Sequence, residues 1–149
     1  MKHWMLMSLM ALCCCLGFTA CGDDDDDFID APDKVVVNDG TITETDNQLV
    51  LKCTAKATQG SKSAKVNLTW TCDFENKRCV KSAHVWTYST EAQAKAYYEG
   101  MTSDPEEARN FTLVGKTVVE DSTEDFMDWE KDRVRHEMEE IKNGKWFDF

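Results

Sequence analysis

The sequence predicts an α+β fold: a mostly antiparallel sheet of about five or six strands, with two helices packed on one face, the longer one C-terminal. Two patterns along the chain support this fold class. Over residues 49–55 and 66–74 apolar and polar side chains alternate, which is the period of a half-buried strand. After residue 90 apolar side chains recur every three or four positions, as they do on a helix. A chain of 149 residues suits one domain, which we assign to residues 34–149.

The first strands are short and separated by turn residues. Residues 34–37 and 41–43 flank Asn38-Asp39-Gly40, and these three residues tolerate the positive φ of tight turns, so we expect a hairpin here. Residues 49–55 alternate between apolar and polar side chains and predict a half-buried strand. A loop over residues 58–63, which contains Gly60, is expected to end it.

The next two strands are the clearest in the chain. Residues 66–74 place Val, Leu, Trp, Cys and Phe on one face and polar side chains on the other. Residues 79–88 form a further strand, but both of its faces carry apolar groups. We therefore expect the strand at 79–88 to be central, or to be covered on both sides.

A helix is predicted to begin at residue 90, where Thr90 and Gln93 have the spacing of a capping box. Gly100 offers its natural stop. Residues 104–107, with Pro second, predict a single helical turn. The apolar stripe of the first helix is Ala94, Tyr97, Tyr98 and Met101.

The last part of the chain returns to strand and then to helix. Residues 111–119 predict two short strands that bend at Gly115. One long helix is expected from near Ser122 to Asn143-Gly144. Its apolar stripe is Met127, Val134, Met138 and Ile141.

Residues 1–20 have the pattern of a signal peptide. A basic start, Met1-Lys2-His3, precedes an apolar run over residues 4–18, which is shorter than the roughly 20 residues that cross a bilayer. Phe18-Thr19-Ala20-Cys21 resembles a bacterial lipobox. The resemblance implies cleavage before Cys21, acylation of Cys21 and a membrane-tethered protein with a soluble body. The alternative is an ordinary signal cleaved after Ala20, with Cys21 left as a free thiol.

Residues 21–33 are predicted to be an acidic, disordered tether that carries seven aspartates and no base. Five of them follow Gly22 directly and resemble the export tag of surface lipoproteins of Bacteroidota. That resemblance implies an outer-membrane protein that faces the exterior. A solvated spacer is the other interpretation, and the two are compatible. The aspartates of the tag are Asp23, Asp24, Asp25, Asp26 and Asp27.

The stretch from Cys72-Asp73-Phe74 to the helix at 91–98 is similar to small surface lipoproteins of the same bacteria, and this similarity implies no known activity. Net charge limits the partners further. Without residues 1–20 the chain has 28 acids and 16 bases, a net charge of −12, which argues against nucleic acid as a partner. Residues 34–90 are mildly basic and residues 91–149 strongly acidic, so electrostatic steering is expected to be directional.

Three cysteines remain beyond the lipobox: Cys53, Cys72 and Cys79. A disulfide between Cys72 and Cys79, a pair that includes Cys53, and three reduced buried thiols all remain open. The spacing of Cys72, Cys79 and His84 matches no tight metal knuckle, so we expect no metal, and no other cofactor is indicated.

His84, Trp86 and Tyr88 share one strand face and are the candidate binding residues. If the helices cover only the opposite face, these rings line a flat exposed platform for a glycan or a partner protein; otherwise they belong to the core. Asp121-Ser122-Thr123 resembles an O-glycosylation motif of exported bacterial proteins, but Ser122 as a helix N-cap explains it equally well.

No nucleophile in the sequence stands in a local signature beside a base, so we expect no enzyme. The expected function is a non-catalytic binding or envelope-accessory role, anchored in the membrane by lipid, with an envelope protein or an extracellular glycan as partner. Two alternatives remain. One is a small hydrolase inhibitor whose plug is the loop at residues 74–77, and the other is an accessory of glycan processing.

Overall fold

The computed structural model of the protein describes residues 34–59 and 61–145. The predictions for the signal peptide, for Cys21 and for the aspartates at 23–27 therefore lie outside the described residues. Within the described part, every pair of neighbouring strands in the sheet is antiparallel. The predicted α+β fold class with a mostly antiparallel sheet is confirmed.

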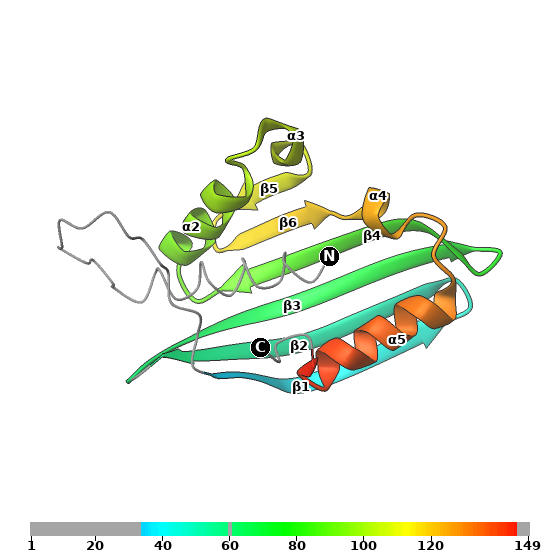
Figure 1. The fold of residues 1–149 in the computed structure, drawn as a ribbon, viewed down its shortest axis with the longest axis horizontal. Coiled ribbons are helices and arrows are strands. Elements are labelled where there is room, and N and C mark those ends of the chain that lie inside the picture. Colours follow the sequence, from blue (N-terminus) through cyan, green and yellow to red (C-terminus); the bar gives the residue numbers. More distant parts are fainter. Residues whose placement is uncertain (1–33, 60, 146–149) are drawn as a thin grey trace.

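The sheet has six strands in the order β1-β2-β3-β4-β6-β5 (Figure 1). The first four are long and follow one another as hairpins, whereas β5 and β6 are short and join the sheet beside β4. β4 is thus a central strand, as its apolar pattern predicted. The strands are β1 (Lys34–Thr45), β2 (Gln48–Gln59), β3 (Lys62–Glu75), β4 (Arg78–Tyr88), β5 (Phe111–Val114) and β6 (Thr117–Asp121).

The hairpin predicted at residues 34–43 is wrong, because this segment is a single strand. Asn38 and Thr41 both pair with β2, and the register shifts between them, so Asp39 and Gly40 form a bulge. Asp39 has a φ of 54°, the conformation that suggested a turn. The turn to β2 lies later, at residues 46–47. An added Cβ on Gly40 would lie 2.6 Å from Cγ of Lys142, so a side chain at the bulge would meet the C-terminal helix.

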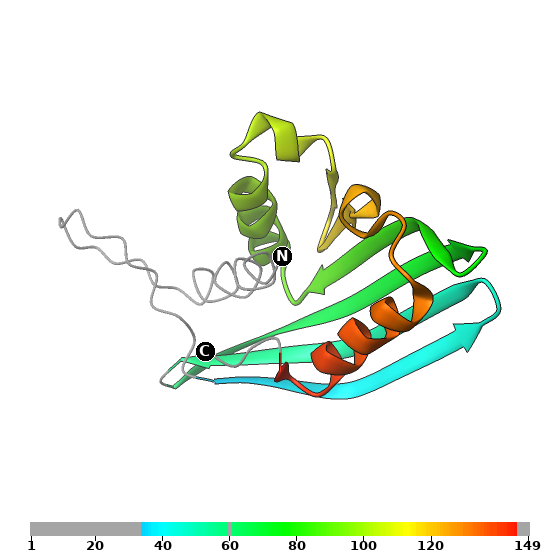
Figure 2. The same ribbon diagram turned by 45° about the vertical axis from the view of Figure 1, so that its right-hand side comes forward.

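Four helices follow β4 in the described residues: α2 (Glu91–Met101), α3 (Pro105–Ala108), α4 (Thr123–Phe126) and α5 (Lys131–Lys142). The predicted capping box at the start of α2 is present, with Thr90 Oγ1 accepting from the Gln93 amide at 3.2 Å. α2 continues through Gly100 to Met101. α2 lies over β4, β5 and β6, and α5 lies over β1 and β2 (Figures 1 and 2).

The single C-terminal helix predicted from Ser122 to Asn143 is wrong, since the chain leaves the helical conformation between α4 and α5. Asp128 has a φ of 64°, and Met127, expected in the apolar stripe, is 45% exposed. The break has a tertiary cause. Between the two helices the chain runs along the start of β4, where the Cys79 amide donates to the Trp129 carbonyl and the Asp128 amide to the Cys79 carbonyl.

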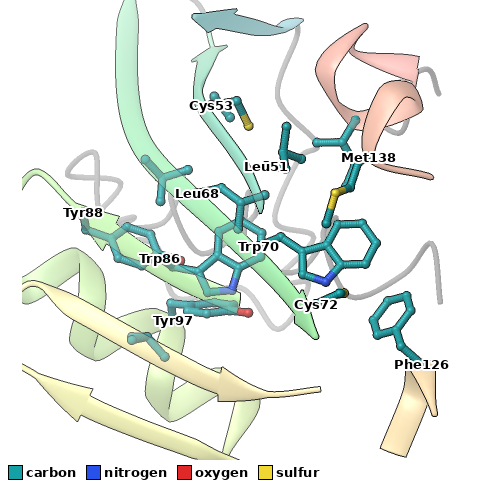
Figure 3. Close-up of a cluster of buried hydrophobic side chains, with 14 of the residues drawn as sticks. Leu51, Cys53, Leu68, Trp70, Cys72, Trp86, Tyr88, Tyr97, Phe126 and Met138 are labelled. Atoms are coloured by element: carbon teal, nitrogen blue, oxygen red, sulfur yellow. The ribbon is translucent and has the colours of Figure 1, made fainter. Parts of the chain in front are cut away.

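The core lies between the sheet and the helices (Figure 3). On β2 the odd-numbered residues from 49 to 57 are buried, and on β3 the even-numbered residues from 64 to 74. Trp70 is fully buried at the centre and stacks on Phe126 of α4, with ring centroids 4.8 Å apart. The helices contribute Ala94, Tyr97, Met101, Phe126, Val134, Met138 and Ile141.

Candidate functional site

The three residues predicted to form an exposed platform are in the core. Trp86 and Tyr88 are 2% and 3% exposed, and His84 is 9% exposed. All three lie on the face of β4 that the helices cover, where Tyr97 of α2 contacts both Trp86 and Tyr88 (Figure 3). The exposed platform is therefore wrong, and the alternative that the rings are core is the one the burial supports.

His84 nevertheless has a polar partner in the interior. Its Nδ1 lies 2.9 Å from Glu120 Oε2 of β6, and both side chains are about nine-tenths buried. The surroundings are apolar and aromatic, with the Trp70 ring 5.1 Å away. Burial and the nearby Glu120 raise the pKa of the Tyr97 hydroxyl and also that of the Asp125 carboxyl. In the described part of the chain, the hydrogen bond of His84 is to the Glu120 carboxylate.

Cys72 and Cys79 are side by side on the core face of the β3–β4 hairpin. The β3–β4 register shifts at Val80, so Phe74 pairs with Cys79 and the two thiols turn to the same side. The hydrogen-bonding interaction between the two thiols raises the pKa of Cys72, and burial raises it further. The same interaction lowers the pKa of Cys79, although burial acts in the opposite direction. Burial raises the pKa of Cys53 to about 11. All three thiols are free in the structure, so the predicted disulfide remains a prediction.

Ser122 is buried as well, with an exposed fraction of 2%. Its hydroxyl lies 2.8 Å from that of Ser82, and it makes no side-chain cap to α4. Instead, the amide of Thr123 donates a hydrogen bond to the Asp121 carboxylate at 3.0 Å, which caps the start of α4. An O-linked sugar on Ser122 is therefore incompatible with this packing.

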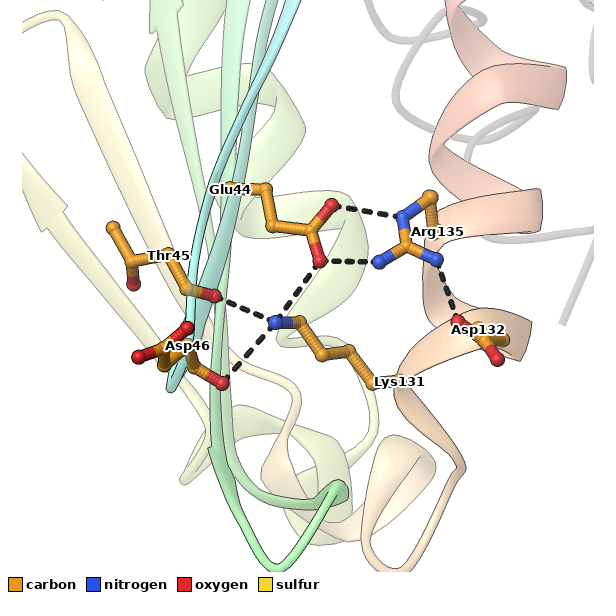
Figure 4. Close-up of polar contacts among 6 residues, drawn as sticks. All are labelled: Glu44, Thr45, Asp46, Lys131, Asp132 and Arg135. Atoms are coloured by element: carbon orange, nitrogen blue, oxygen red, sulfur yellow. Dashed lines mark hydrogen bonds and ion pairs between the residues drawn. The ribbon is translucent and has the colours of Figure 1, made fainter.

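A groove of about 710 Å³ opens where the β1–β2 turn, the β3–β4 turn and the start of α5 meet. Most of its charges are paired with one another (Figure 4). Glu44 accepts from Nε and Nη2 of Arg135 and lies 3.0 Å from Lys131 Nζ, and these cations lower its pKa. Lys131 also donates to the Thr45 carbonyl at 2.6 Å. These contacts attach the start of α5 to the end of β1, so they stabilise the fold.

Among the described residues no helix packs on the opposite face of the sheet, since α2, α4 and α5 bury their apolar side chains on the core face. Each side chain on this uncovered face is exposed or only half-buried, and the register aligns them into rows across the strands. One row, for example, runs from Thr41 of β1 through Lys52 and Thr69 to Val85 of β4. The threonines on this face of β2, β3 and β4 are Thr54, Thr58, Thr69, Thr71 and Thr87.

Lysines gather at one end of this uncovered face. Lys56 of β2 pairs directly with Lys65 of β3, and Lys52 lies four residues before Lys56 on the same face. Lys34 pairs with Thr58 in the next row. The acidic residues Asp73 and Asp121 lie in other rows, opposite Lys81 and Ala83 respectively. We call Lys34, Lys52, Lys56 and Lys65 the lysine patch.

Comparison with family models, with curated proteins and with solved structures finds no match for this chain. Within residues 34–59 and 61–145, no helix has the length and apolar character that spanning a membrane requires. No group of three or more His, Cys, Asp or Glu side chains in that part of the chain is placed to hold a metal ion.

The sequence indicated which side chains lie on the polar face of each strand, but not how far the uncovered face extends across the sheet. Alternation showed polar faces at Lys52-Thr54-Lys56 and at Lys65-Asn67-Thr69, one strand at a time. Only the strand register places Lys56 opposite Lys65. The groove had no local signal, because Glu44 and Arg135 are 91 positions apart.

Proposed function

We propose that this protein is a lipid-anchored outer-membrane protein, exposed on the cell surface, whose domain binds an extracellular or envelope partner without catalysis. The uncovered face of the sheet is the observation that carries the proposal. It presents threonine and lysine side chains on a rigid antiparallel ladder, whereas the helices fill the other face with core packing. Side chains on regular elements hold their positions well enough for recognition.

The charges of the domain favour the same face. The groove beside α5 neutralises its own charges, so little is left there to attract a partner. On the uncovered face the lysine patch is unpaired in the described residues. The lipobox resemblance at Cys21 and the aspartates that follow it support the surface location.

Site-specific photo-crosslinking on intact cells tests this function. A photoreactive amino acid at Thr69, in the middle of the uncovered face, should capture a partner on brief illumination. The same group at Lys95, an exposed position on α2, is the matched control and should capture little. External protease should also degrade the protein on intact cells. Equal capture from both positions, or protection from the protease, would contradict the proposal.

The tip of the β3–β4 hairpin favours a second function, the inhibition of a hydrolase. Asn76 and Lys77 have φ values of 50° and 64°, as in a tight two-residue turn. Two hydrogen bonds attach the tip to the segment at the start of α5. The Lys131 amide donates to the Lys77 carbonyl, and the Arg78 side chain donates to the Asp128 carbonyl. A rigid projecting loop is suited to filling a cleft. Replacing Asn76 and Lys77 by glycine and alanine should then abolish capture of a hydrolase while the domain stays folded, and unchanged capture removes this alternative.

A further inference from the structure

The lysine patch places like charges together without an opposing charge. Lys56 and Lys65 are directly opposite each other on neighbouring strands, where Cβ atoms are about 5 Å apart. Neither ammonium group has a hydrogen bond or an ion pair among residues 34–59 and 61–145. Like charges facing each other across strands destabilise a sheet, so the arrangement suits a surface that an anion neutralises.

The polar groups between the lysines are also donors. Thr54 Oγ1 donates to the Asn67 side-chain oxygen at 2.8 Å. The NH2 group of that amide supplies two further hydrogen-bond donors. A surface of ammonium and amide donors matches oxygen acceptors that carry negative charge.

The shape of the patch indicates an extended ligand. Lys52 and Lys56 are four residues apart on one strand, which separates their Cα atoms by about 13 Å. The register extends the patch across three strands. One small anion cannot contact lysines at both ends, but a polymer with a charge on each repeat can. A polymer that carries a negative charge on each repeat and also has hydroxyl groups to bond the polar side chains of the patch is an acidic polysaccharide.

Two other anionic partners fit the patch less well. Insertion into a membrane needs exposed apolar side chains, and the large exposed ones in the described residues, Val114 and Met127, lie outside the patch. Binding of single-stranded nucleic acid relies on aromatic stacking, and the uncovered faces of β1, β2 and β3 carry no aromatic side chain.

We propose that the lysine patch of the uncovered sheet face binds an acidic polysaccharide through its carboxylate or sulfate groups. This inference rests on the proposed binding function of the same face and names the chemistry of its ligand. Binding is expected to weaken as salt concentration rises, because exposed charges are screened.

Binding assays on the purified chain from residue 21, with Cys21→Ser to prevent acylation, test the proposal. The immobilised probes are polygalacturonate for carboxylate, dextran sulfate for sulfate and plain dextran as the neutral polymer. We expect retention on at least one charged polymer and none on dextran. Lys56→Gln with Lys65→Gln should weaken that binding at least tenfold. The control pair, Lys95→Gln with Lys145→Gln, removes the same charge from helix-side lysines and should change affinity less than twofold.

Each other outcome overturns the inference. The absence of retention on both charged polymers removes it, and so does equal weakening by the control pair, which would mark a general charge effect. Vesicles containing an anionic lipid form a further arm, and binding to them without binding to polymers would assign the patch to a membrane instead. Capture from Thr69 on cells without any polymer binding would leave the proposed function standing while this inference falls. Circular dichroism confirms that each variant is folded.

Discussion

The Ser82 hydroxyl is within hydrogen-bond distance of three other side chains in the core. It lies within 3.0 Å of the buried Trp70 indole nitrogen, which donates to it, and also lies 2.8 Å from the Ser122 hydroxyl. The Cys72 thiol is 3.4 Å away. All of these groups are in the core, where a polar atom without a partner is costly.

We therefore expect Ser82→Ala to destabilise the domain by about 1–3 kcal/mol, since it removes one acceptor of a buried indole N–H and a partner of the buried Ser122 hydroxyl. Urea unfolding followed by tryptophan fluorescence measures the change. Ser89→Ala is the matched control, because that hydroxyl is exposed and donates only to the Lys65 carbonyl, and it should stay within about 0.5 kcal/mol of the parent. Equal losses in both variants would show that the Ser82 network contributes nothing particular.

The thiol pair gives a second prediction at this scale. In an oxidising envelope, the Cys79 thiolate should attack a protein disulfide of a thiol oxidase, and Cys72 should then displace the oxidase as a dithiol, which leaves a Cys72–Cys79 bond. The neighbouring Cys72 lowers the pKa of Cys79, which favours the first step. Closing this eight-residue loop is expected to stabilise the domain by about 2.5 kcal/mol on the chain-entropy model.

Alkylation of the denatured, unreduced protein with a thiol reagent measures the bond. After isolation from the cell envelope, we expect Cys53 to be labelled and Cys72 and Cys79 to be protected until a reductant is added. Labelling of all three residues without reductant would mean that the pair stays reduced in the cell. Cys53→Ser provides the control, since the pair should remain protected in that variant.

At the scale of elements, α5 is held by charge as well as by packing. Its apolar side of Val134, Met138 and Ile141 is buried on β1 and β2, while Arg135 and Lys131 reach Glu44 (Figure 4). Because these cations lower the pKa of Glu44, its carboxylate favours the folded state at pH values above its ordinary pKa of 4.5. That contribution is lost as the pH falls through the depressed folded value.

Glu44→Gln should therefore loosen α5 at neutral pH and make its attachment less sensitive to acid. Hydrogen exchange resolved by residue is the suitable measurement, because the groups are exposed and global stability should change little. Amides of α5 should exchange several times faster than in the parent at pH 7, and the difference should shrink below pH 4.5. Amides of α2 provide the internal control. Unchanged α5 exchange at pH 7 would mean that packing alone holds the helix.

Local signals in the sequence were enough to predict some elements and not others. The capping box of α2, the Asp-Pro turn of α3 and the bend at Gly115 depend on neighbouring residues, and each is found in the structure. The bulge in β1 and the break between α4 and α5 depend on distant ones. Asn38-Asp39-Gly40 suits a turn and a bulge equally, and the long partner strand β2 decides between them. The helical conformation is interrupted at Asp128, where the backbone amide of Cys79 donates to the Trp129 carbonyl.

The difference between local signals and contacts of distant residues also explains why the predicted binding platform was wrong. Alternation assigned His84, Trp86 and Tyr88 to one face of β4, but not which face the helices would cover. Tyr97 packs against Trp86 and Tyr88, so the aromatic face is inside and the threonine and lysine face is outside. A sheet that is polar on one side and apolar on the other can bury only the apolar side favourably. Combining the polar faces of β2 and β3 would have identified the uncovered surface.

At the scale of the whole molecule, charge is divided between the two layers. The uncovered sheet face carries most of the lysines of residues 34–90, whereas the chain after residue 90 has twice as many acids as bases. A body of this kind has a preferred orientation in an electric field, and an anchored protein beside an anionic polymer would turn its sheet toward that polymer. In the proposed function, Cys21 would anchor the protein and the lysine patch would orient it.

Two variants outside the described residues separate anchoring from export. Cys21→Ser removes the acylation site, so the protein should move from the membrane pellet to the soluble fraction, because a body with a net charge of −12 has no other affinity for a bilayer interior. Replacing Asp23 to Asp27 by asparagine keeps the lipid, so this variant should stay in the pellet but become resistant to protease added to intact cells. Fractionation with immunoblotting gives the first readout and protease treatment the second. If the Cys21→Ser protein still sediments with membranes, the lipid anchor is not what holds it there; if the asparagine variant remains as sensitive to protease as its parent, the aspartates are a spacer and carry no export information.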